Sequence, residues 1–431
     1  MPPDRVQLKA CFKIKLRPFF RPVKIGFYFL GLVGCKILAP TNARSPKDQA
    51  SNIQSAENSK FALNDASILF PPPDKMADLN FYLGLESKES SLISRKNYEF
   101  IRKSSSHREM PISDELSKRV LDYSQWKVVA FRFDPCHKTK IDSPCQGQIR
   151  LVAQPMIEPL KNEKRRVPNQ IFAADFGMHL IYSINPSQVN EVIGSLRESK
   201  RRYNPNSRMQ PLGVHPAFLS PSRDEFAQQI KKLIVTYSKE EDLSFAAFLG
   251  SAVAVTGDLP FRWLFSAYRV EKDQVIPFKI PNTEETVMRF FLAEGDGENG
   301  ILPLPSIKGD SLAPALDSVR IFEDVPYAKD AINKAIRIEN PNLHSAESVD
   351  CVSCHIATTV RVPLESQLFG EKGLDSKDRY MNSKQNLKRD PLYRTGALFV
   401  HNFGFINNEP IVSQRTINEA AKASDFINAI P

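Results

Sequence analysis

The chain has 431 residues, of which 42% are hydrophobic and 25% charged, so it can bury two hydrophobic cores if each domain holds about 100 to 200 residues. Its formal net charge is +9, but the residues before Cys35 carry seven basic side chains and one acidic one, and hence +6 of that charge. The +3 that remains does not support nucleic-acid binding through a basic surface. We expect no nucleic-acid partner.

The first 34 residues have the pattern of a signal peptide. A basic segment that ends at Lys24 is followed by the uncharged run Ile25–Gly34, IGFYFLGLVG. This run is about half of the roughly 20 residues that a membrane-spanning helix needs, and it ends at a small residue, as a cleavage site does. The pattern predicts a cleaved signal peptide over residues 1–34.

The end of the apolar run, Leu32-Val33-Gly34-Cys35, resembles the lipobox of bacterial lipoproteins. The resemblance implies cleavage before Cys35, diacylglycerol on its sulfur and a further acyl chain on its amine, which together would anchor the protein to a membrane. Lys36 follows in place of an acidic residue, so we expect the periplasmic face of the outer membrane rather than the inner membrane. The alternative is an ordinary signal peptide in which Cys35 has no role.

The segment 35–110 is rich in serine, asparagine and lysine and has few apolar residues. Such a composition does not offset the entropy lost on ordering, so it predicts a flexible tether. Short apolar islands, among them Phe70–Pro73, could dock on the folded body.

Residues 111–322 alternate between strand-like and helix-like patterns, which predicts an α+β domain with a mixed or antiparallel sheet and flanking helices. Helices are expected after Ser187 and after Ser222, where Glu225 would complete a capping box. Residues Glu271 to Gln274 predict a hairpin turn. The predicted strands are Trp126–Phe133, Ile149–Ala153, His179–Ile184, Leu243–Leu249, Arg262–Val270, Val275–Ile280 and Val287–Leu292.

No motif in this middle region indicates a chemistry, and we interpret His179 and His215 as ordinary hydrogen-bonded histidines. Cys136 and Cys145 lie in a polar loop between two predicted strands. In an oxidising compartment they predict a disulfide that closes a hairpin.

Residues 323–431 contain the most informative motif of the chain, Cys351-Val352-Ser353-Cys354-His355. The C-x-x-C-H pattern is the attachment signature of c-type haem, because the two thiols add to the porphyrin vinyl groups and the imidazole then ligates the iron. The alternatives are a redox pair, half of a zinc site or a structural disulfide. The signal peptide favours haem, and no second cluster completes a zinc site.

Helices predicted over Pro326–Ile338 and from a capping box at Thr416 and Glu419 would bracket the motif. The arrangement resembles small c-type cytochromes, and the resemblance implies a mostly helical haem domain with a distal ligand. The candidates for that ligand are Met381, His401 and His344, and Arg361 could pair with a haem propionate.

The sequence therefore predicts a lipoprotein with one covalent haem c that transfers electrons to a redox partner protein, and it favours a carrier over an enzyme. One alternative is a peroxidase-like haem enzyme with an open distal site. Another is an envelope binding module whose main function lies in the middle domain.

Overall fold

The structure is a computed structural model of the chain. It describes residues 60–73, 76–86, 91–105, 115–138, 143–158, 170–204, 210–251, 261–291, 300–306, 309–313, 321, 323–390, 393, 400–406 and 408–430. Residues from Asn52 to Pro431 form one compact unit. The predicted signal peptide and the lipidation site Cys35 lie outside the described residues.

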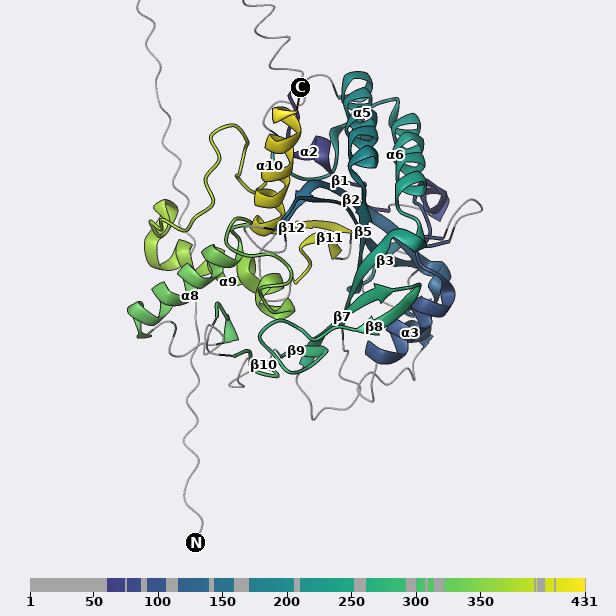
Figure 1. Ribbon diagram of the computed structural model, residues 1–431. Coiled ribbons are helices and arrows are strands. Elements are labelled where there is room, and N and C mark those ends of the chain that lie inside the picture. Colours follow the sequence, from purple (N-terminus) through teal and green to yellow (C-terminus); the bar gives the residue numbers. More distant parts are fainter. Residues whose placement is uncertain are drawn as a thin grey trace, which may run out of the picture. The chain divides into compact units, whose positions relative to one another are not determined.

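The centre of the unit is a ten-stranded antiparallel sheet, which confirms the predicted α+β class (Figure 1). Its order is β1-β2-β3-β5-β6-β7-β9-β10, with β4 paired to β3 and β8 paired to β7. The strands are β1 (Ser67–Leu69), β2 (Trp126–His137), β3 (Gln146–Ile157), β4 (Phe172–Ala173), β5 (Gly177–Ile184), β6 (Leu243–Ser251), β7 (Phe261–Glu271), β8 (Gln274–Pro277), β9 (Val287–Phe291) and β10 (Gly300–Leu302). A separate hairpin joins β11 (Phe403–Ile406) to β12 (Glu409–Val412).

The strand predictions hold because period-two alternation marks these segments. In β3, for example, Ile149 and Leu151 are fully buried, whereas Arg150 between them is only partly buried on the opposite face. The predicted turn between β7 and β8 is also present, with positive φ angles at Lys272 and Asp273. Two consecutive residues of this kind define the tight hairpin turn that matches the twist of the flanking strands.

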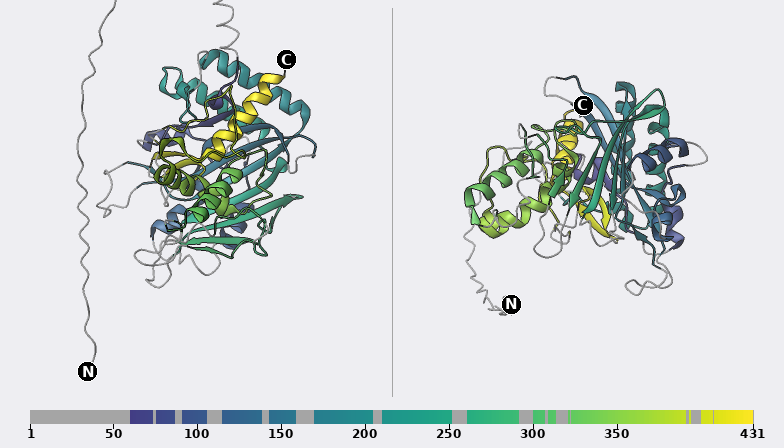
Figure 2. Two further views of the ribbon diagram at one scale, coloured as in Figure 1. Left: turned by 90° about the vertical axis from the view of Figure 1, so that its left-hand side faces the viewer. Right: turned by 90° about the horizontal axis from the view of Figure 1, so that it is seen from below.

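Helices cover both faces of the sheet. In the right-hand view of Figure 2, the green α8 and α9 and the yellow α10 lie on one side, and α3, α5 and α6 lie on the other. The helices are α2 (Leu63–Ala66), α3 (Arg95–Ser105), α4 (Glu115–Val120), α5 (Pro186–Tyr203), α6 (Arg223–Tyr237), α8 (Val325–Ile338), α9 (Cys351–Phe369) and α10 (Gln414–Ala429). The sheet is thus a shared wall between an N-terminal and a C-terminal helical layer.

Two helix starts differ from the prediction. The Ser222 side chain makes no capping hydrogen bond at the start of α6. Helix α10 begins one turn earlier than Thr416, because Ser413 accepts the capping hydrogen bond from the Thr416 backbone N–H. Glu419, which the sequence predicts to close a capping box, binds arginine side chains instead.

Much of the segment predicted as a tether over residues 35–110 is folded where the structure describes it. Strand β1 pairs with β2, and Phe61, Phe70 and Tyr98 are buried in the core. The apolar islands in this polar segment, together with strand pairing, supply the burial that composition alone does not reveal.

The C-terminal elements pack directly on the sheet. Helix α10 contacts β2 and α2, and α9 contacts β7 and β9. The residues after 322 therefore belong to the same compact unit as the sheet.

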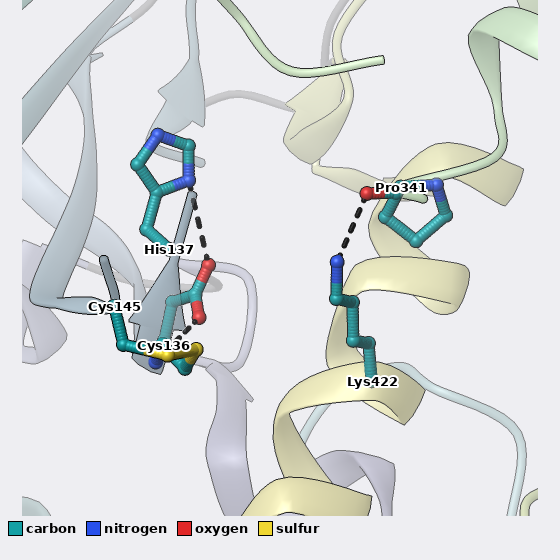
Figure 3. Close-up of a disulfide and its surroundings, with 6 residues drawn as sticks. Cys136, His137, Cys145, Pro341 and Lys422 are labelled. Atoms are coloured by element: carbon teal, nitrogen blue, oxygen red, sulfur yellow. Dashed lines mark hydrogen bonds and ion pairs between the residues drawn. A yellow bond between two sulfur atoms is a disulfide. The ribbon is translucent and has the colours of Figure 1, made fainter. Parts of the chain in front are cut away.

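The predicted disulfide between Cys136 and Cys145 is present and joins the end of β2 to the residue before β3 (Figure 3). Beside it, His137 binds Arg150 at 2.9 Å. Across the view in Figure 3, the Lys422 amine of α10 donates to the Pro341 carbonyl at 3.0 Å. The bridge therefore has the structural role expected of it.

Among the described residues, no helix is both long and apolar enough to span a bilayer.

Candidate functional site

The C-x-x-C-H motif forms the first turn of α9. Asp350 caps the helix by accepting a hydrogen bond from the Ser353 backbone N–H at 2.8 Å, and the Ser353 hydroxyl accepts one from Leu312 N–H at 3.0 Å. Residues three and four positions apart share a helix face, so Cys354 and His355 follow Cys351 on one side of α9. All three side chains point into one cavity.

This cavity lies between the sheet and the C-terminal layer and has an empty volume of about 880 Å³, including space open to solvent. The C-terminal wall is formed by the motif together with Val349, Asn402, Phe403 and Arg415.

The sheet wall of the cavity is built from two rows of directly paired strand positions. Residues opposite each other in neighbouring strands project to the same face of a sheet. The first row consists of Arg132, Arg150, Ile181 and Phe245, and the second of Val152, His179 and Ala247. Antiparallel register therefore brings two arginines and one histidine onto the face opposite the motif.

His355 is held in the orientation of a metal ligand. Its Nδ1 lies 2.7 Å from the Val400 carbonyl oxygen, so Nδ1 carries the proton and donates it, and Nε2 keeps a free lone pair. Burial lowers the pKa of His355 to about 4, against the opposing effect of the Val400 hydrogen bond. The ring is therefore neutral at physiological pH, which is the form that binds metals.

His179 faces His355 across the cavity. The two ring centroids are 5.6 Å apart, with an angle of 86° between the ring planes. Burial, followed by repulsion from His355 and His401, lowers the pKa of His179 well below its ordinary value. The sequence alone indicates an ordinary histidine at this position. Its position in β5 could have revealed its importance, because strand alternation places it on the same face of the sheet as the arginines of β2 and β3.

Three arginines form a positive wall around Glu419 of α10. Its carboxylate binds Arg132 at 2.7 Å, Arg150 at 3.3 Å and Arg415 at 2.7 Å. Burial alone would raise the pKa of Glu419, but the arginines outweigh it and hold that pKa well below the ordinary value. Arg150 also binds Asp134 at 3.0 Å. The three guanidinium groups thus face two carboxylates, which leaves an excess positive charge beside the cavity.

The two thiols of the motif are protonated at neutral pH. Burial raises the pKa of Cys354 to about 11 and that of Cys351 further still. Redox-active C-x-x-C pairs have lowered thiol pKa values instead, so the environment does not favour thiol–disulfide chemistry. Within the described residues, no group of three or more His, Cys, Asp or Glu side chains could hold a metal ion.

The three distal-ligand candidates from the sequence do not line this cavity. Met381 is 79% exposed. His401 is buried, and its Nε2 lies 2.8 Å from an oxygen of Asp175. The two ring nitrogens of His344 bind Asp310 at 2.8 Å and Ser348 at 3.0 Å.

The suggested propionate partner Arg361 also lies elsewhere. It is buried in α9, where it binds Glu339 and Glu365. Both carboxylates therefore engage this guanidinium group within the protein interior.

The side chains around the cavity fit a c-type haem. The motif offers two thiols for the vinyl groups and one imidazole with a free Nε2, and the arginine wall offers donors for the propionates. Val152, Ile181 and Phe245 supply apolar surface for the ring.

Comparison with known proteins gives no relative for this chain. No family model matches it, and no curated protein and no solved structure was found to be similar. The cavity and the motif are therefore the basis for a functional proposal.

Proposed function

We propose that this protein binds one c-type haem covalently through Cys351 and Cys354, with His355 as an axial ligand, and transfers electrons to a redox partner protein. The observation that carries the proposal is that all three side chains line one cavity, opposite a wall of arginine and imidazole groups.

The bound haem would supply an iron that cycles between the ferrous and ferric states. The protein would hold the haem and set the reduction potential of its iron. The Val400 carbonyl keeps the His355 tautomer and orientation. Arg132, Arg150 and Arg415 compensate the propionate charges, and the apolar side chains keep water from the ring.

We also propose that residues 323–431 act as a cytochrome c-like segment in which α8, α9 and α10 surround the attachment site. The sheet supplies the opposite wall, so haem binding would require the whole unit rather than this segment alone.

Haem attachment is tested by making the protein with a cytochrome c maturation system. We expect a haem stain that persists through denaturing electrophoresis and a c-type pyridine haemochrome spectrum, because thioether bonds survive unfolding. Replacing Cys351 and Cys354 together with alanine should abolish the stain. The matched control is the Cys136→Ala/Cys145→Ala variant, which loses two cysteines of the disulfide and should keep it. A parent protein without covalent haem would refute the proposal.

We also propose that the protein is a lipoprotein of the bacterial outer membrane, anchored at Cys35. Two or three acyl chains hold a protein on a membrane stably, whereas one does not. The Cys35→Ser variant should no longer incorporate radioactive palmitate and should be released from membranes. Cys11→Ser, which also removes an N-terminal cysteine, should be labelled like the parent. Equal labelling of Cys35→Ser and the parent would contradict the anchor.

A further inference from the structure

We propose that His179 of β5 is the second axial ligand of the haem, an inference that rests on the proposed function. His179 lies on the sheet wall of the cavity and His355 on the helical wall, and their rings are neighbours. The two imidazoles come from segments 176 positions apart in the sequence and meet only because the sheet and α9 pack together.

The spacing of the rings suits a shared metal. Two metal–imidazole bonds of about 2 Å each place the bound nitrogens about 4 Å apart and the ring centroids about 6 Å apart. The observed centroid separation is 5.6 Å. A side-chain adjustment of less than about 1 Å, within the freedom of histidine rotamers, would reach that distance.

Among the histidines that the structure describes, only His179 forms no hydrogen bond to the protein. The other histidines among the described residues hydrogen-bond to protein groups: His137, His215, His344, His355 and His401. The His179 ring forms no hydrogen bond with any residue that the structure describes. Its side chain is half-buried on the cavity wall, so its ring nitrogens are available to a ligand that enters the cavity.

The assignment has a functional consequence. Two imidazole ligands lower the reduction potential relative to a histidine–methionine pair and leave no open position on the iron. This coordination suits electron transfer, because peroxide or a gas would first have to displace one of the imidazoles. The arginine wall would offset part of the lowered potential, because positive charge near the iron favours the ferrous state.

The test uses the optical and electron paramagnetic resonance spectra of the full-length holoprotein. The parent should be low-spin in both oxidation states. The His179→Ala variant should keep its covalent haem stain but become high-spin, bind carbon monoxide when reduced, and return to low-spin when imidazole is added. His179→Met, which fills similar volume, should remain low-spin with a higher reduction potential.

Matched controls are His344→Ala, Met381→Ala and His401→Gln, all of which should leave the parent spectrum unchanged. The assignment would be overturned if the His179→Ala variant remained low-spin. It would also be overturned if one of the control variants lost the low-spin spectrum of the parent. A parent that is already high-spin with covalent haem would also overturn it, while leaving haem attachment intact. If the parent carries no covalent haem, the proposed function fails first, and the stain reports that result separately from the spin state.

Discussion

Replacing Glu419 by glutamine should lower the free energy of unfolding by about 3 to 5 kcal/mol at pH 7, because three guanidinium groups would then be left around a neutral side chain in a shielded site. Glu419 binds Arg132, Arg150 and Arg415, and its side chain is only 15% exposed. Chemical denaturation of matched samples measures the difference. The control is Glu191→Gln on the exposed surface of α5, where we expect a change below about 0.5 kcal/mol.

The loss of stability caused by Glu419→Gln should depend on pH. The folded-state pKa of Glu419 is held well below its ordinary value, so its charge stabilises the fold above the unfolded-state pKa of about 4.3. That contribution is lost as the pH falls through the folded-state pKa. The stability gap between the parent and Glu419→Gln should therefore be constant from pH 6 to 8, on the order of 3 to 5 kcal/mol, and shrink below about pH 4. A gap that does not depend on pH would show that the charge is not its source.

Replacing Arg361 by leucine should destabilise the protein by a similar amount, about 3 to 5 kcal/mol, because the buried carboxylates of Glu339 and Glu365 would lose their shared partner. Glu339 lies just after α8, and Arg361 lies in α9, the helix that begins with the C-x-x-C-H motif, so this ion pair joins the two helices. Thermal and urea unfolding would measure the loss.

Two further variants distinguish charge from packing at this site. Arg361→Leu/Glu339→Leu removes Arg361 together with one of its two carboxylate partners and should recover part of the stability, because Glu365 still binds Arg379 and fewer charges remain buried without a partner. Arg201→Leu breaks an exposed pair with Glu198 and should cost no more than about 1 kcal/mol. Equal losses in Arg201→Leu and Arg361→Leu would contradict the special role of the buried cluster.

The sequence predicts the local structure of this protein well, because local structure depends on local patterns. The alternation of Ile149, Arg150 and Leu151 indicates a strand with two different faces, and the strand is there. The spacing of Cys136 and Cys145 between two such strands correctly predicts the hairpin disulfide. The start of α10 is misplaced by one turn because Ser413 and Thr416 both have a side chain that can cap a helix.

The composition of the cavity cannot be predicted in the same way. His179 becomes significant only once β5 is paired in register with β3 and β6 and α9 is packed over that face. Those contacts span long stretches of chain and depend on strand order, which no local pattern encodes. The sequence suggests His344, which lies just upstream of the motif, and His401, which has phenylalanine neighbours in the sequence. In the structure these two histidines bind Asp310 and Asp175.

The construction of the cavity would also decide when the proposed haem could be attached. Its walls come from β2 near the start of the folded unit and from α10 near its end, so the pocket is incomplete until these elements have come together. Cys351 and Cys354 line this pocket between the sheet and the C-terminal helices. An enzyme that formed the proposed thioether bonds would need access to both sulfurs, and that access would be greatest before α9 docks. Attachment would then compete with docking, and slow closure of this long-range contact would favour the haem-loaded protein.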